Sequence, residues 1–274
     1  MSTHTALDEQ QAAADAPAPA DVPAQAPAPA SAARVDAESI AATAAAHAHQ
    51  HRDVNGGWLR PAVFGAMDGL VSNFALMSGV VGGDAGHGAV VLTGLAGLIA
   101  GACSMAAGEY TSVASQRELV QAELETERLE LQRNPQAELA ELAQMYVERG
   151  VQPELAFEVA RQLSRDPEQA LDVHAREELG VDPNDLPSPL VAAVSSFGSF
   201  GLGALLPLLP FLLGAHAMLP MLLLSLAGLF ACGAVVSKVT ARSWWFSGLR
   251  QLVLGAAAAG VTFVLGHAIG AQIG

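Results

Sequence analysis

One acidic residue interrupts a stretch that is otherwise apolar enough to lie in a membrane. Asp68 lies near the start of "FGAMDGLVSNFALMSGVVGG", residues 64–83. An ionisable group inside a spanning helix costs about 2.5–3.5 kcal/mol on insertion, so such residues usually face a pathway or a partner. A carboxylate there can bind a cation and can also take up and release a proton. We therefore predict that Asp68 lies on an ion pathway rather than having a purely structural role.

Three further residues of the same stretch, and one of the next apolar segment, could line this pathway. They are Met67, Ser72, Asn73 and Met105. The thioether of Met105 is a ligand that softer transition metals accept and Mg(II) does not. An isolated methionine in a spanning helix is ordinarily a packing residue. The interpretation of Met105 as a ligand therefore depends on its lying near Asp68.

A second set of candidate ligands lies in a polar segment farther along the chain, at spacings that place its members on shared helical faces. The set is Glu123, Glu127 and Glu130 at i, i+4 and i+7, Glu138 and Glu141 at i, i+3, and His174 with Glu178 at i, i+4. Several carboxylates with one imidazole suit Fe(II), Mn(II) or Zn(II). A solvated acidic helix surface is the alternative interpretation.

The composition indicates what must position these residues. The 274 residues are 51% hydrophobic but only 5% aromatic, with 27 glycines and a mean hydropathy of +0.35, which is typical of close helix packing in a membrane. The net charge of −14 argues against a nucleic-acid partner and favours cations. Cys103 and Cys232 both lie in apolar segments, so we expect packing residues and no disulfide framework.

Five apolar segments are each close to the roughly 20 residues that a helix needs to cross a bilayer. They are residues 61–83, 88–108, 189–214, 218–238 and 249–271. The predicted fold class is therefore an all-α integral membrane protein with five transmembrane helices. Pro207 and Pro210 in the third segment are compatible with a spanning helix whose neighbours satisfy the freed carbonyls.

Basic residues predict the orientation. They precede the first span as Arg52 and Arg60, lie between the second and third spans, and join the fourth span to the fifth. The other two connections contain no Lys or Arg. The positive-inside rule then places the N-terminus and the segment between the second and third spans in the cytosol and the C-terminus outside.

Residues 109–187 hold 18 of the 27 acidic residues, and we call this segment the acidic insert. Pro135, Pro153 and Pro167 each follow a polar or cap residue, a pattern that predicts three helix starts. The second span is expected to continue into the insert without a break. We divide the chain into transmembrane segments at 58–110 and 188–274 around a helical cytosolic metal-binding domain at 111–187.

Residues 1–55 form an Ala/Pro-rich segment for which we predict a disordered cytosolic tail. It ends with His47, His49 and His51, a pattern that could bind a divalent metal weakly, although a solvated run without fixed geometry is the simpler interpretation.

Three quoted motifs, in order around the insert, resemble the vacuolar iron transporter family in a bacterial form. They are "RPAVFGAMDGLVSNFALMSGVVGG", "GLAGLIAGACSMAAGEYTSVASQRE" and "SFGSFGLGALLPLLPFLL", and the resemblance spans residues 58–272. It implies five spans per subunit, a homodimer, and a three-helix cytosolic metal-binding domain. It also implies exchange of Fe(II) or another divalent metal for protons.

The resemblance also implies roles for individual residues. Asp68 matches the aspartate of the first span and Met105 the methionine of the second, while the metal-site glutamates correspond to Glu127, Glu130, Glu138, Glu141 and Glu178. Two positions depart from the family pattern. His174 replaces a methionine of eukaryotic members, and Gly97 replaces a glutamate that many members carry, which leaves the proton stoichiometry open.

We therefore expect a proton-coupled exporter of cytosolic Fe(II), and also Mn(II), in a bacterial plasma membrane, with no permanently bound cofactor and no nucleic-acid partner. The sequence does not rank Fe(II) against Mn(II), Co(II) or Zn(II). The alternative is a membrane-anchored metal sensor or storage protein without transport. An enzyme is not expected, since no nucleophile with a base, phosphate-binding loop or open His-rich site is evident.

Overall fold

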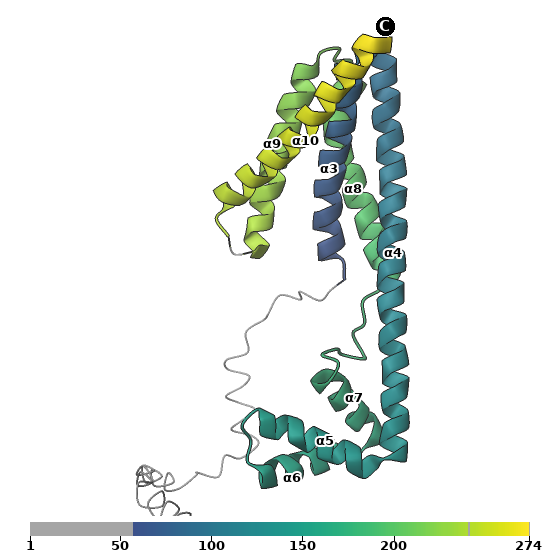
Figure 1. Cartoon of the computed structure of the whole chain (residues 1–274), viewed down its shortest axis with the longest axis vertical. Helices are drawn as coiled ribbons and strands as arrows, with labels where there is room; N and C mark the ends of the chain where they lie inside the picture. Colours follow the sequence, from purple (N-terminus) through teal and green to yellow (C-terminus); the bar gives the residue numbers. More distant parts are fainter. Residues whose placement is uncertain (1–56, 241, 274) are drawn as a thin grey trace, which may run out of the picture. The chain divides into compact units, whose positions relative to one another are not determined.

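The computed structural model describes residues 57–240 and 242–273, and the predictions for residues 1–55, including the three tail histidines, lie outside this part. The described residues are helical and contain no strand (Figure 1). Their helices are α3 (Leu59–Gly82), α4 (His87–Arg133), α5 (Pro135–Glu148), α6 (Pro153–Leu163), α7 (Pro167–Glu177), α8 (Pro189–Leu212), α9 (Met218–Thr240) and α10 (Trp244–Ile273).

Five of these helices, α3, α4, α8, α9 and α10, are long and apolar enough to cross a membrane, which confirms the predicted count. Four begin within two residues of their predicted starts, whereas α10 begins at Trp244 rather than at residue 249. The added turn carries exposed Trp244, Trp245 and Phe246. Aromatic rings of this kind favour the membrane–water interface. Because this turn lies outside the most apolar part of the helix, the hydropathy of the sequence did not include it in the predicted span.

The helix α4 is continuous over 47 residues, as predicted, and links the spans to the acidic insert. At 1.5 Å per residue it is about 70 Å long, more than twice the roughly 30 Å of a hydrocarbon core. One continuous helix therefore runs from the spans into the insert (Figure 1).

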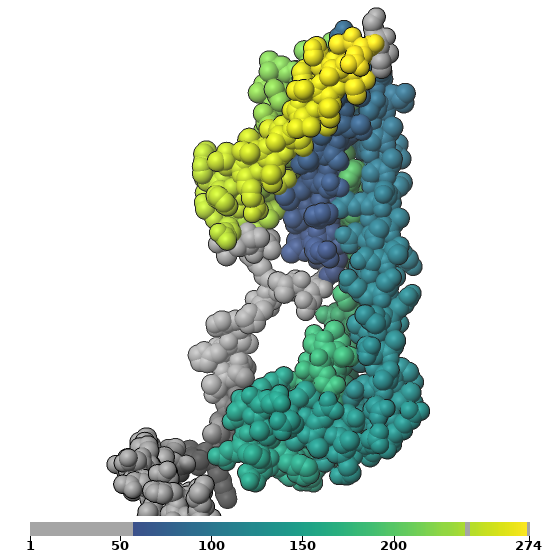
Figure 2. Space-filling view, viewed as in Figure 1, coloured from purple at the N-terminus to yellow at the C-terminus, as the bar shows by residue number. Residues whose placement is uncertain are grey.

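The helix α3 contacts each of the other four apolar helices. It packs closely against α8, where a methyl group on Gly69 would collide with the backbone of Phe200, and one on Gly203 with the backbone of Ala66. Small residues let helix backbones approach in this way in membranes. The helix α10 lies across the visible face of the bundle (Figure 2), and many of its large apolar side chains are exposed.

The three proline-marked helix starts in the acidic insert are confirmed at Pro135, Pro153 and Pro167. Asp166 caps α7, where its carboxylate accepts two backbone N–H hydrogen bonds. Asn134 precedes α5, but its side-chain amide donates to Glu130 at 2.7 Å instead of capping the helix. A small core around Leu142 joins α5 to α6 and α7, as expected for short helices that need one another.

Candidate metal site and ion pathway

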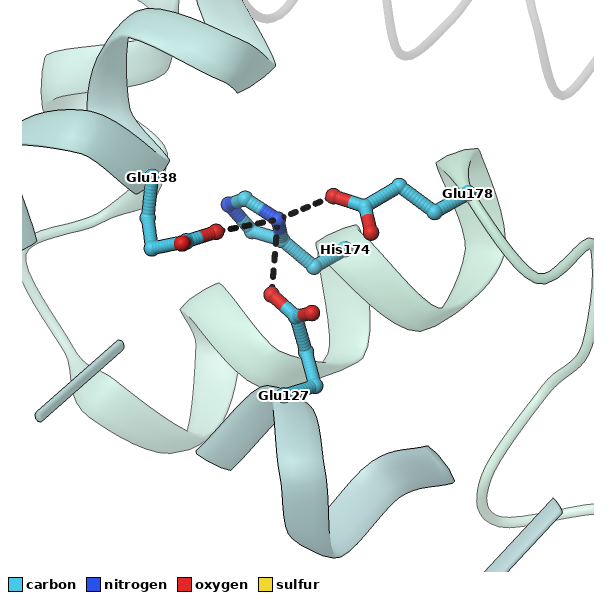
Figure 3. A group of neighbouring side chains, drawn as sticks. All are labelled: Glu127, Glu138, His174 and Glu178. Atoms are coloured by element: carbon cyan, nitrogen blue, oxygen red, sulfur yellow. Dashed lines mark hydrogen bonds and ion pairs between the residues drawn. The ribbon is translucent and has the colours of Figure 1, made fainter. Parts of the chain in front are cut away.

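One imidazole and three carboxylates from three different helices converge in the acidic insert (Figure 3). The Nδ1 atom of His174 lies 2.6 Å from Glu178, 3.0 Å from Glu127 and 3.9 Å from Glu138. One potential ligand atom from each residue lies within 4.8 Å of all the others. His174 is fully buried, and the three carboxylates are at most 23% exposed. We call these four residues the insert cluster.

The arrangement leaves more acceptors than protons. A neutral imidazole can offer at most one proton at Nδ1, and Glu178 at 2.6 Å is the nearest acceptor. The nearby Glu127 oxygen is buried and has no aligned hydrogen bond among the described residues. A cation held between the His174 nitrogen and the carboxylate oxygens would give each of these atoms a partner. The donor set, one nitrogen and three oxygens, fits Fe(II), Mn(II) or Zn(II).

Burial and mutual repulsion raise the pKa values of two of these carboxyl groups. The pKa of Glu127 rises to about 7, first because of burial and then because of the neighbouring charge of Glu178. Burial, followed by the charge of Glu141, raises the pKa of Glu138. The imidazole of His174 opposes both shifts. A bound cation would lower these pKa values again, because the ionised carboxylates would then face a positive charge.

The structure separates the seven predicted ligands into two groups. Glu127, Glu138, His174 and Glu178 form the cluster. Glu130 and Glu141 act on the cluster through their charges but place no oxygen within it, and Glu130 accepts a hydrogen bond from Asn134 instead. Glu123 is exposed on α4 and lies outside the cluster.

A second polar site lies among the apolar helices. Asp68, Ser72 and Asn73 of α3 line a cavity of about 420 Å³ together with Met105 of α4. This cavity opens to the surface of the single chain, and Asp68 is exposed there. The structure thus brings together a carboxylate, an amide, a hydroxyl and a thioether from the predicted set in one cavity.

Asn73 and Gly97 shape the inner wall of this cavity. The Asn73 amide nitrogen donates to the Ala204 carbonyl at 2.7 Å, while its oxygen is buried and has no partner among the described residues. A methyl group on Gly97 would lie 2.7 Å from that oxygen. A cation or its water shell could satisfy the unpartnered oxygen. Because Gly97 has no side chain, the space beside the Asn73 oxygen stays open.

Met67 is not part of this cavity. It lines an apolar groove with Ala66 of α3 and Cys232 of α9. Successive helical residues point about 100° apart, so Met67 and Asp68 face different sides of α3. Ser104 and Phe200 are among the lining residues that we did not predict. Ser104 directly precedes Met105, whereas Phe200 enters from α8 and no local spacing indicates it.

These features define an all-helical membrane protein with a polar cavity among its spans and an acidic cluster between the second and third. Comparison with known proteins identifies the family. The model of the VIT family matches residues 59–267, and the chain belongs to this family.

Three relatives illustrate the similarity. The chain is 44% identical to a vacuolar iron transporter of Acanthamoeba castellanii over 180 residues, which cover 63% of this chain and 65% of the relative. It is 30% identical over 214 residues to vacuolar iron transporter 1 of Arabidopsis thaliana, covering 77% and 86%. It is also 34% identical to vacuolar iron transporter homolog 5 of Oryza sativa, covering 76% and 78%. The match thus spans just under two thirds of the Acanthamoeba protein.

Proposed function

We propose that this protein exchanges cytosolic Fe(II), and also Mn(II), for protons across a bacterial plasma membrane. The observation that carries the proposal is the cavity lined by Asp68, Asn73 and Met105, which offers two oxygens and one sulfur at a position within the spans. Relatives described as vacuolar iron transporters support metal transport. Divalent iron accepts this mixture of oxygen and soft sulfur donors.

Proton coupling follows from the same carboxylate. Asp68 can bind either a cation or a proton, so protonation from the outside would release the metal and reset the carrier. The insert cluster would capture metal first and raise its concentration at the cytosolic entrance. The proposed orientation, with the N-terminus and the acidic insert in the cytosol and the C-terminus outside, rests on the positive-inside rule.

A second copy of the chain would complete the pathway. An ionisable residue rarely faces lipid, yet Asp68 is exposed on the surface of the single chain. A homodimer with its two-fold axis near Asp68 would cover both cavities and enclose one conduit between them. The homodimer is therefore part of the proposal.

Flux measurements in proteoliposomes test this function. Fe(II) and Mn(II) movement is followed under an imposed pH gradient for the parent chain, for Asp68→Asn and for Glu127→Gln/His174→Ala. We expect Asp68→Asn to abolish gradient-driven flux and the insert variant to reduce it. Asp84→Asn is the matched control, because Asp84 is an exposed carboxylate in the α3–α4 connection outside the cavity.

The result also separates this proposal from a membrane-anchored sensor or storage protein. Such a protein would bind metal through the insert cluster but would show no flux under any gradient. Parent-like flux in Asp68→Asn, with unchanged pH dependence, would refute the assigned role of the carboxylate.

A further inference from the structure

Two histidines from different connections meet at the end of the bundle where α4 begins. His87 is the first residue of α4, and His216 lies in the connection between α8 and α9. Their ring centroids are 4.5 Å apart, with the ring planes inclined by 47°. The ring of His87 also packs against Phe211 of α8, at 5.8 Å between centroids. The insert cluster lies toward the other end of α4, which carries Glu127 40 residues after His87.

The pair contains an unsatisfied nitrogen. The Nδ1 atom of His87 is buried and has no hydrogen-bond partner in the part of the chain that the structure describes. A buried polar atom without a partner is destabilising and is rare in native structures. His216 is exposed, so solvent and solutes can reach the pair from its side. The pair therefore combines an unpartnered, buried nitrogen with a neighbouring imidazole that solvent reaches.

The ring separation matches two imidazoles on one metal ion. A metal–nitrogen bond of about 2.0–2.1 Å places the ion roughly 3.2 Å from each ring centre. Two such ring centres would then lie about 4.5 Å apart for a right angle at the metal and about 5.2 Å apart for a tetrahedral angle. The observed 4.5 Å falls at the lower end of this range. Aromatic packing alone would also allow this separation, but it leaves the Nδ1 nitrogen unexplained.

We propose that His87 and His216 form a two-imidazole site for a divalent transition metal. Among the described residues, the insert cluster is the one group in which three or more potential ligands converge, so water would complete the coordination of the histidine pair. Imidazole favours Cu(II), Ni(II), Zn(II) and Fe(II) over Mg(II) or Ca(II). Two protein ligands with water make a weak, exchangeable site. If the proposed transport direction holds, this pair would hold the metal briefly where it leaves the membrane.

Cu(II) is a suitable probe, because its electron paramagnetic resonance spectrum reports the number of bound imidazole nitrogens. The chain has eight histidines. Substitution of His4, His47, His49, His51 and His174 by Ala in the full chain leaves His87, His216 and His267. This background protein is titrated with Cu(II) in nanodiscs, and affinity and nitrogen couplings are measured.

We expect one Cu(II) signal with two coupled nitrogens, because the carboxylates left in the insert cluster contribute no nitrogen coupling. His216→Ala should weaken binding at least about tenfold and leave a single nitrogen coupling. His87→Phe should do the same while it keeps an aromatic ring against Phe211, so a loss of binding there is not a loss of packing. His267→Ala, on α10 and outside the pair, is the matched control and should change neither quantity.

Two results would overturn the inference. Cu(II) binding that is unchanged in both His87→Phe and His216→Ala would show that the rings only pack. Equal losses in these variants and in His267→Ala would show dispersed surface binding. Because the readout is equilibrium binding, it is independent of flux, and a failure of the proposed transport would not produce either result.

Discussion

The insert cluster predicts that one substitution has opposite effects on stability and on metal binding. Glu127→Gln removes a carboxylate whose pKa is raised from 4.5 to about 7 by burial and by Glu178. A raised pKa means that the folded state binds the proton more tightly than the unfolded state. The metal-free parent therefore loses stability as the pH rises from 4.5 through 7, and Gln avoids this loss.

The magnitude follows from the shift. A change of about 2.5 pKa units corresponds to about 3.4 kcal/mol at a pH above 7. Solvent screening and relaxation of the coupled carboxylates reduce this, so we expect Glu127→Gln to stabilise the insert by about 1–3 kcal/mol at pH 8. At pH 4.5 the carboxyl is protonated in the folded state and half protonated in the unfolded state, so the effect should fall below about 0.5 kcal/mol.

Hydrogen–deuterium exchange of the full chain measures this effect. Amides of α7, which carries His174, report local opening, and 1–3 kcal/mol corresponds to about 5- to 150-fold slower exchange in EDTA at pH 8. Addition of Mn(II) should reverse the order, because the parent gains a full ligand set and Glu127→Gln does not.

A matched control distinguishes the effect of removing a cluster carboxylate from the effect of removing any negative charge on α4. Glu123 lies one turn earlier on α4 and is exposed, so Glu123→Gln removes the same charge without touching the cluster. It should change α7 exchange little, in EDTA or in Mn(II). The reasoning is refuted if Glu127→Gln exchanges as fast as the parent at pH 8 without metal.

Three further predictions concern metal affinity and flux. Metal affinity of the insert should rise about tenfold per pH unit up to pH 7 and level off above it, because Glu127 must lose its proton to bind; titration calorimetry across pH 5.5–8.5 measures this. Gly97→Ala should reduce flux at least about tenfold while the protein stays folded, because the added methyl lies 2.7 Å from the Asn73 oxygen; the liposome assay would contradict this with parent-like rates. Met105→Leu conserves volume but removes the sulfur, so Fe(II) flux should fall more than Mn(II) flux, and equal losses would count against a ligand role.

The elements that position both sites could be predicted from the sequence because each has a local cause. Length and hydropathy mark the spans, and a proline at the first helical position fixes the starts of α5, α6 and α7. The absence of any helix-ending signal after the second span predicts the unbroken α4. Such features depend on neighbours within one or two turns.

The membership of each site depends on packing between helices, which local spacing does not determine. Glu127 and Glu130 share a helical face with Glu123, but only Glu127 reaches His174 from another helix. Phe200 enters the cavity because glycines let α8 approach α3 closely. Met67 differs, because the rotation of the helix between adjacent residues already places it away from Asp68.

The helix α4 also gives a role to acidic residues that belong to neither site. It carries Met105 of the cavity and Glu127 of the cluster, 22 residues and about 33 Å apart along one continuous helix. Glu109, Glu118, Glu123 and Glu125 lie between them, and the last three are exposed. Such charges bind no single ion tightly but raise the local cation concentration along their length. In the proposed transport, a metal ion released from the insert cluster would therefore remain close to α4 on its way to Asp68, which would explain why this helix is both long and acidic.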